Sequence, residues 1–181
     1  MEVIAATPDA AQRAAEVIRS GGVVALPTDT FYGLAVDPSQ DAAVDRLHRI
    51  KGRPPDKPYP LLIPKVASVE ALTASFPAPA MRLAQEWWPG PLTLLLPSAP
   101  GLGAGFNGGT SVIGVRIAKH PMVALTLAAL GGGAITGTSA NRAGQPPSRT
   151  VTGVVAAFEG GAGAPDLVLD GGMTQALAAS T

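Results

Sequence analysis

Three cations stand within seven residues in the segment Lys51-Gly-Arg53-Pro-Pro-Asp-Lys57, and Pro58 follows them. Proline fixes φ and favours extended geometry in the residue before it, so the three prolines predict an ordered loop rather than a helix. The guanidinium of Arg53 can grip two phosphate oxygens at once, whereas Lys51 and Lys57 offer point charges. These residue types favour an anion-binding loop, with a solvated basic turn as the alternative.

Hydroxyl and amide groups are concentrated in two other segments, each of which follows an apolar run of strand character. These residues are Thr28, Thr30, Tyr32, Ser139, Asn141 and Ser148. In open α/β sheets, ligands bind at the carboxyl ends of strands, so the two segments are candidate parts of one site.

Arg116 adds a cation inside the otherwise apolar run Val112–Ile117. A buried guanidinium is costly unless an anion pairs with it, and that anion can come from the protein or from a ligand. Together with the polar segments, Arg116 favours binding of phosphates and carboxylates by positioning and charge neutralisation, without a covalent intermediate. The residues alone predict binding of a nucleotide or a similar anion.

Several other kinds of site are disfavoured. The chain has no cysteine, which excludes a disulfide framework and a thiolate nucleophile. Neither histidine is expected to be catalytic, because His48 lies among charged residues of a predicted helix and His120 precedes a proline. Because no H-E-x-x-H motif or carboxylate cluster is present, we expect no metal held by protein ligands alone.

Two glycine-containing segments resemble known motifs but do not meet the requirements of those motifs. The segment 103–108 matches G-x-G-x-x-G, but a predicted strand follows it where the dinucleotide fingerprint requires a helix. The segment 137–141 lacks the second glycine of the nucleophile elbow, since Asn141 stands in its place.

Length and composition favour one α/β domain over residues 1–181. The chain is 46% hydrophobic and 14% charged, with 22 glycines and 18 prolines, as in a well-buried protein with many tight turns. The net charge is zero, which argues against a surface that binds nucleic acid all over. Yet six of the 13 cations fall within residues 46–65, so we expect a local positive field.

Strands and helices are expected to alternate along the chain. Apolar runs predict strands at 3–6, 23–26, 59–63, 92–96, 112–117, 134–136 and 166–170. Helical spacing predicts helices at 8–20, 41–50, 66–72, 78–88, 121–130 and 151–158. In the helix at 78–88, we expect the apolar stripe that contains Met81 and Trp87 to lie in the core.

No apolar stretch approaches the roughly 20 residues of a membrane span, and the start lacks the pattern of a signal peptide. The expectation is a soluble cytoplasmic protein without membrane contact.

Motifs along nearly the whole chain resemble the YrdC-like family, the threonylcarbamoyl-AMP synthases. They are Pro27-Thr-Asp-Thr-Phe-Tyr-Gly-Leu34, Lys51-Gly-Arg53 with Asp56-Lys-Pro58, Trp88-Pro-Gly-Pro-Leu-Thr93, Gly114-Val-Arg116 and Thr138-Ser-Ala-Asn141. The Lys-x-Arg and Ser-x-Asn pair is the signature of that family. The resemblance implies a twisted mixed β-sheet flanked by helices around a positively charged groove.

The resemblance also implies an activity: conversion of L-threonine, bicarbonate and ATP, which brings Mg²⁺, to threonylcarbamoyl-AMP and pyrophosphate. The product would feed the N6-threonylcarbamoyl modification of tRNA position 37 through a downstream transferase complex. Lys51 and Arg53 would be catalytic. The implied ATP-binding residues are Lys51, Arg53, Lys57, Ser139, Asn141, Pro147 and Ser148. The implied threonine-binding residues are Thr30, Tyr32, Arg116, Thr138 and Ser180.

The chain departs from the family at two places. Many members have serine where Pro147 stands, so either Pro147 or the adjacent Ser148 would contact ATP. Members usually continue past a Ser-Thr pair like Ser180-Thr181, which predicts a C-terminally shortened member or an incomplete polypeptide.

Two other functions remain as alternatives. An RNA-binding or ribosome-maturation module would use the same basic groove. A domain detached from a hydrogenase-maturation protein ranks last, because no zinc-finger cysteines accompany the chain.

Overall fold

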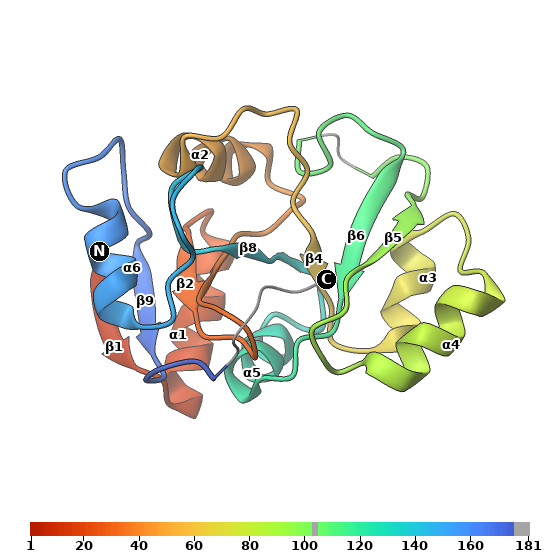
Figure 1. Ribbon diagram of the computed structural model, residues 1–181, viewed down its shortest axis with the longest axis horizontal. Helices are drawn as coiled ribbons and strands as arrows, with labels where there is room; N and C mark the ends of the chain where they lie inside the picture. Colours follow the sequence, from red (N-terminus) through yellow and green to blue (C-terminus); the bar gives the residue numbers. More distant parts are fainter. Residues whose placement is uncertain (103–104, 176–181) are drawn as a thin grey trace.

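The computed structural model describes residues 1–102 and 105–175. Its helices are α1 (Pro8–Arg19), α2 (Asp41–Lys51), α3 (Val69–Leu72), α4 (Ala78–Trp87), α5 (Pro121–Ala129) and α6 (Val151–Phe158), with a 3-10 turn at Val66–Ser68. Its strands are β1 (Glu2–Ala5), β2 (Val24–Leu26), β3 (Gly33–Ala35), β4 (Leu61–Leu62), β5 (Leu94–Pro97), β6 (Val112–Arg116), β7 (Ile135–Thr136), β8 (Thr138–Ser139) and β9 (Leu167–Asp170). The expected mixed α/β class is confirmed (Figure 1).

Side-chain caps fix the starts of two helices where the sequence predicts them. The Thr7 hydroxyl accepts a hydrogen bond from the amide of Ala10, and Pro8 occupies the first turn of α1. The Thr150 hydroxyl accepts from the amide of Gly153 at the start of α6. These caps satisfy amides that have no partner inside their helices.

The strands form two mixed sheets. In the first, the order is β1-β9-β2-β3-β8, with β1 and β2 parallel to β9 and with β3 antiparallel to both β2 and β8. In the second, the order is β5-β6-β4-β7, and only β4 and β6 are parallel. A hydrogen bond of 3.0 Å from the Thr136 amide to the Val36 carbonyl links the two sheets.

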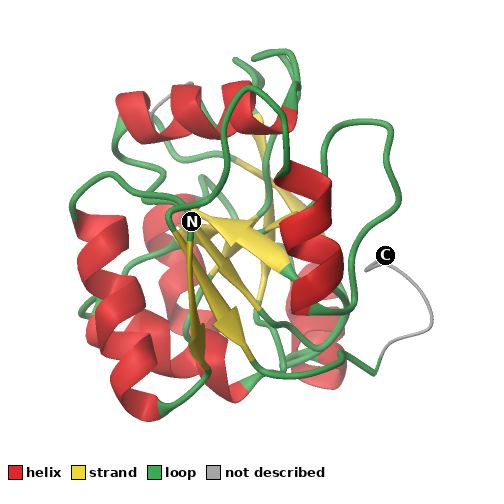
Figure 2. Cartoon of the chain, turned by 90° about the vertical axis from the view of Figure 1, so that its left-hand side faces the viewer, coloured by secondary structure: helices red, strands yellow, loops and turns green. Residues whose placement is uncertain are grey.

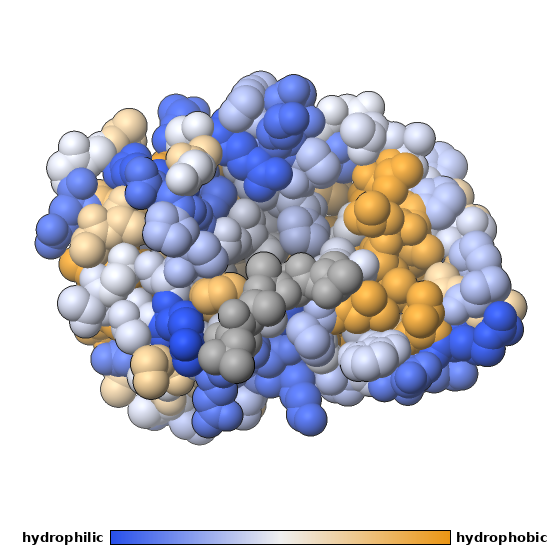
Figure 3. Space-filling view, viewed as in Figure 1, coloured by the Kyte–Doolittle hydropathy of each residue, from blue (hydrophilic) through white to orange (hydrophobic). Residues whose placement is uncertain are grey.

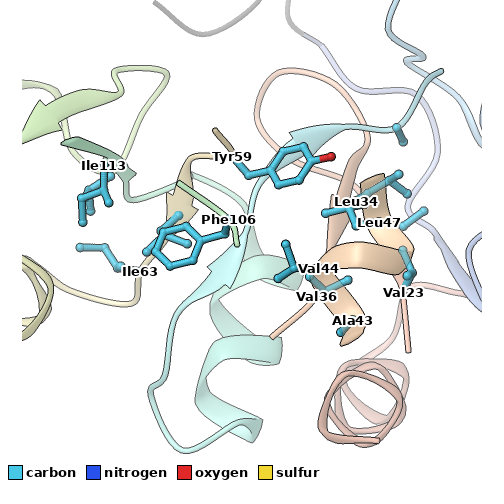
Figure 4. Packing of buried hydrophobic residues seen from close by; sticks show 14 of the residues in the cluster. Val23, Leu34, Val36, Ala43, Val44, Leu47, Tyr59, Ile63, Phe106 and Ile113 are labelled. Atoms are coloured by element: carbon cyan, nitrogen blue, oxygen red, sulfur yellow. The ribbon is translucent and has the colours of Figure 1, made fainter. Parts of the chain in front are cut away.

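Helices cover both faces of the first sheet, as Figure 2 shows. Helices α1 and α5 pack against Val24 and Leu26 of β2, while α2 and α6 share a core cluster with Ala25. A strand covered on both faces must be apolar at every position, which explains the continuous run in β2. The core on the α2 side continues into the second sheet through Tyr59, Phe106 and Ile113 (Figure 4).

The segment from Ile135 to Ser139 belongs to both sheets. Its first two residues pair with β4 as β7, and its last two pair with β3 as β8, which crosses the middle of the molecule in Figure 1. Gly137 lies between them, and its amide donates to the Pro60 carbonyl at 2.8 Å. A side chain at position 137 would meet Leu62, so only glycine fits this crossing point.

One expectation for a helix surface was wrong. The apolar stripe of α4 is largely solvent-exposed: Ala84 and the following Trp88 are buried, but Met81 and Trp87 are 41% and 51% exposed. On α2, Arg46 forms an ion pair of 2.5 Å with Asp166, the residue before β9. No helix in the described residues is long and apolar enough to cross a membrane.

Candidate active site

Helix α2 ends in the loop that carries the cation cluster. Gly52 takes the left-handed conformation with φ of 60°, and the Arg53 amide donates to the carbonyl of His48 at 3.0 Å. This C-cap turns the chain sharply, so that the loop leaves α2 beside the segment after β8. The sequence prediction of a non-helical loop is confirmed.

Lys51 is buried although it is a lysine, with only 3% of its surface exposed. Its Nζ donates to the carbonyls of Ser139 at 2.5 Å and Asn141 at 2.8 Å. Burial, with a smaller contribution from the neighbouring charge of Arg53, lowers the pKa of Lys51 to about 8. Lys51 therefore ties α2 to the segment after β8 and places a readily titrated amine there.

A pocket of about 390 Å³ opens beside Lys51. It is lined by Lys51, Arg53, Pro54, Lys57, Thr138, Ser139, Asn141, Ala143 and Gly144. The structure thus brings together the three cations of the loop and the Ser-x-Asn motif, although they are more than 80 residues apart in the chain. Figure 3 shows hydrophilic residues gathered over the loop after α2.

Asn141 carries an acceptor without a partner in this pocket. Its Nδ2 donates to the carbonyls of Arg142 and Gln145, which fixes the orientation of the amide. Its Oδ1 is buried and has no hydrogen-bond partner among the described residues. Buried polar atoms are normally satisfied, so this oxygen is available to a ligand donor.

A second pocket, of about 220 Å³, lies on the other side of β8. It is lined by Thr28, Thr30, Phe31, Tyr32, Gly33, Pro60, Leu62, Arg116, Gly137, Thr138, Ser139 and Pro147. Thr138 and Ser139 line both pockets, so β8 forms a wall common to the two.

Arg116 is buried at the second pocket and has its anion within the protein. Its Nη2 lies 2.5 Å from Asp29 Oδ1, its Nε donates to the Gly90 carbonyl at 2.9 Å, and its Nη1 donates to Thr30 at 3.4 Å. Burial lowers the pKa of Arg116, and the charge of Asp29 opposes that shift. Of the five donors of a guanidinium, three are engaged and two remain for a ligand.

Hydroxyl groups of the β2–β3 loop are organised by the loop itself. The Thr28 hydroxyl donates to the Phe31 carbonyl at 2.7 Å and lies 3.0 Å from the Thr30 hydroxyl. Tyr32 contributes to the pocket lining, but its hydroxyl donates to the Gly172 carbonyl at 2.7 Å. The polar end of Tyr32 therefore tethers the chain after β9.

The remaining predicted residues fall in different places. Pro147 lines the second pocket rather than the cation-lined one. Ser148 lines neither of these pockets, and its carbonyl accepts from the Tyr32 amide at 3.0 Å. Ser180 lies outside the described residues.

Sequence reasoning missed the residues that hold the cations in place. Asp29, which neutralises Arg116, lies in the motif Pro27–Leu34. A carboxylate among these polar residues could have been predicted as the partner of the buried arginine. His48 and Tyr59 lie behind Arg53, yet nothing in their spacing indicates that contact. Among the described residues, no group of three His, Cys, Asp or Glu side chains could hold a metal ion.

A larger cavity of about 510 Å³ lies elsewhere, near Ile18, Phe106 and Leu130. Its lining is mainly apolar and includes none of the predicted site residues. The pockets of about 390 and 220 Å³ are lined by every described predicted site residue except Ser148, so they form the candidate site.

Known proteins with sequences similar to this chain are called threonylcarbamoyl-AMP synthase. The protein called threonylcarbamoyl-AMP synthase in Alkalilimnicola ehrlichii is 44% identical over 137 residues, which are 76% of this chain and 70% of that one. The protein of that name in Pyrococcus abyssi is 37% identical over 162 residues, covering 90% of this chain and 46% of its own length.

Solved structures agree with the fold. The Pyrococcus abyssi Sua5 protein complexed with L-threonine matches with a TM-score of 0.91 and 32% identity over 99% of this chain and 52% of that one. Escherichia coli YciO matches in fold with a TM-score of 0.81 at 23% identity, over 93% of this chain and 81% of its own. The chain therefore spans about half of the archaeal protein.

The family profile described as "Telomere recombination" matches residues 16–181, which include both pockets and every motif quoted above. The chain belongs to the Sua5/YciO/YrdC family.

Proposed function

We propose that this chain synthesises L-threonylcarbamoyl-AMP from L-threonine, bicarbonate and ATP, with release of pyrophosphate. It would thus act as a nucleotidyltransferase. One observation carries the proposal: a cation-lined pocket and a pocket with a buried arginine share Thr138 and Ser139 as a common wall. This arrangement suits two substrates that must react with each other, and the names of the relatives support the choice of substrates.

The pocket of about 220 Å³, which Arg116 lines, would hold L-threonine. The two free donors of Arg116 would bind its carboxylate, while Thr30 and Thr138 would contact its polar groups. Asp29 and the Gly90 carbonyl hold the guanidinium in place before the substrate arrives. Such preorganisation lowers the entropic cost of aligning the amine with the second substrate.

The cation-lined pocket, of about 390 Å³, would hold ATP. Arg53 and Lys57 would bind the β- and γ-phosphates, with Lys51 beside them, and the free Oδ1 of Asn141 would accept a hydrogen bond from the nucleoside. Mg²⁺ would enter with ATP as part of the substrate, coordinated by phosphate oxygens, because the described acidic residues form no cluster of their own.

The reaction would run in two steps across the common wall. The threonine amine attacks the carbon of bicarbonate, giving N-carboxythreonine and water. A carboxylate oxygen of this carbamate then attacks the α-phosphorus of ATP, and the bond to the bridging oxygen of pyrophosphate breaks. Lys51, Arg53 and Lys57 would neutralise the charge that develops on the leaving group, which is the main contribution of a protein to such transfers.

The product would serve the N6-threonylcarbamoyl modification of tRNA position 37 in the cytoplasm, through a downstream transferase complex. The RNA-binding alternative would use the same two pockets. Salt-sensitive RNA binding without nucleotide turnover would favour that alternative.

The proposal is tested by pyrophosphate release from ATP, measured with and without threonine and bicarbonate. Release should require both, and it should fall at least about a hundredfold in Arg53→Ala and Lys51→Met. Arg82→Ala and Lys65→Met remove the same charges from exposed positions and should leave the rate unchanged. Pyrophosphate release that ignores threonine, or full activity in both site variants, would refute the assignment.

A further inference from the structure

Arg53 is stacked on an aromatic ring that the proposed function does not use. Its guanidinium carbon lies 5.0 Å from the centroid of the Tyr59 ring. Tyr59 is fully buried, whereas Arg53 lines the cation-lined pocket. A guanidinium over an aromatic face is attracted by the electrons of the ring, and the contact restricts its movement.

The Tyr59 ring is itself fixed by a hydrogen-bonded pair. The Tyr59 hydroxyl lies 3.0 Å from His48 Nδ1, and His48 Nε2 lies 3.4 Å from the Gly105 carbonyl. His48 Nδ1 also lies 3.3 Å from the Arg53 carbonyl, so the imidazole links the Tyr59 ring to the backbone of Arg53. Burial raises the pKa of Tyr59 to about 12, so the phenol stays protonated.

Backbone contacts join the same residues to the loop after α2 that carries Arg53 and Lys57. The Arg53 amide donates to the His48 carbonyl at 3.0 Å, and the Tyr59 amide donates to the Phe106 carbonyl at 2.6 Å. Figure 4 shows the Tyr59 ring in the buried cluster that also holds Phe106 and Leu47, the latter on α2 beside His48. Both ends of the loop between residues 48 and 59 are thus anchored to one rigid cluster.

A purely structural role explains the Tyr59 and His48 pair poorly. Leucine or phenylalanine would fill the same volume without burying a hydroxyl and an imidazole, whose burial is unfavourable unless every polar atom is paired. Here the polar atoms are paired with each other and with backbone, and the ring face is turned to Arg53.

We propose that Tyr59, held by His48, is a positioning residue that sets the Arg53 guanidinium for the phosphates of ATP. This inference rests on the proposed function, because it takes ATP as the ligand of Arg53. Tyr59 itself touches no substrate; it acts through the direction and restricted freedom of Arg53.

The test compares two substitutions at Tyr59 in the full chain. Tyr59→Phe keeps the ring but releases it from His48, and it should raise the KM for ATP less than removal of the ring does. Tyr59→Leu removes the ring and should raise the KM for ATP about tenfold, the equivalent of about 1.4 kcal/mol, while the KM for threonine stays unchanged. If the leucine variant does not fold, Tyr59→Met replaces it.

Phe158→Leu is the matched control. Phe158 is also buried and also lies under an arginine, with Arg142 at 5.4 Å, but it lines neither pocket. This variant should lower the melting temperature as Tyr59→Leu does, without any change in the KM for ATP. Equal effects of the two leucine variants on that KM would overturn the proposal.

A double-mutant cycle separates positioning from general damage. In Arg53→Ala, the further change Tyr59→Leu should have no added effect on ATP affinity, because the guanidinium is already gone. Additive losses would overturn the proposal. Calorimetric titration with ATP reports this cycle without turnover, so a failure of the synthase activity and a failure of the positioning role give different results.

Discussion

Lys51 differs from the other cations of its loop, because its ammonium group has exchanged water for two backbone carbonyls. Carbonyl dipoles solvate a charge less well than water does, and Arg53 adds a like charge nearby. The protonated form is therefore destabilised, and the pKa of Lys51 falls to about 8. An arriving phosphate group would restore the charge, so the proposed nucleotide binding would be linked to proton uptake.

This linkage predicts that ATP binding weakens above pH 8. Below the lowered pKa the amine is charged and can bind phosphate, whereas above it the amine is neutral. The KM for ATP should rise by up to about tenfold between pH 8 and 9. Steady-state kinetics over pH 6.5–9.5 would measure this rise in the KM for ATP.

Two variants assign the inflection. Lys51→Met should remove it, while Lys57→Met should raise the KM for ATP but keep the inflection near pH 8. A profile that is flat in the unaltered protein, or that survives Lys51→Met, would show that another group is responsible.

The candidate site residues were easier to predict than their partners. Arg116 was identified because a cation in an apolar strand demands an anion, but the source of that anion could not be decided from spacing alone. Asp29 is 87 residues away in the chain and meets Arg116 because the fold brings the loop between β2 and β3 beside the end of β6. Which of Pro147 and Ser148 faces a pocket likewise depends on how one loop lies on another.

At the scale of elements, long periodic segments were predicted well, and two short strands were missed. Helices α1, α2, α5 and α6 lie within a residue of the predicted bounds, because their apolar spacing and caps are local signals. Strands β3 and β8 were missed, since three residues with a glycine and a Thr-Ser pair carry no alternation. Their existence depends on tertiary pairing with each other.

The cap of α6 should be measurable as stability. Thr150→Ala removes the hydroxyl that accepts from the Gly153 amide and should lower the free energy of unfolding by about 1 kcal/mol. Thr152→Ala removes the same group from an exposed position inside the helix and should cost nothing, because alanine favours helix. Urea denaturation of both variants would compare them, and equal values would contradict the capping role.

At the scale of the whole molecule, apolar side chains remain exposed on one face of the edge strand β5 and of its neighbour β6 in the second sheet. Leu95 of β5 is 74% exposed and Val112 of β6 is 40% exposed, and Figure 3 shows hydrophobic residues gathered over these strands. The flanking sequence from Pro91 to Ala99 contains no charge. Uncharged edge strands are prone to pair with other chains, so this edge favours self-association at high concentration.

Leu95→Thr should therefore raise the solubility limit, with a change in unfolding free energy below about 0.5 kcal/mol. Its neighbour Leu94 points to the opposite face and is buried, so Leu94→Thr should cost more than about 1 kcal/mol. Light scattering as a function of protein concentration would measure the solubility of the two variants, and thermal melts would measure their stability. Stability losses of equal size would show that the two side chains are equally buried in solution.

The common wall formed by Thr138 and Ser139 also has a thermodynamic consequence. Because β8 is paired with β3 on one edge and is continuous with β7 of the other sheet, a ligand that shifts it in one pocket reshapes the other. Threonine and ATP should then bind cooperatively, and linkage requires each to change the affinity of the other by the same factor. Two calorimetric titrations, each ligand added to the complex of the other, would measure one coupling constant twice, and a factor of one would contradict the predicted cooperativity.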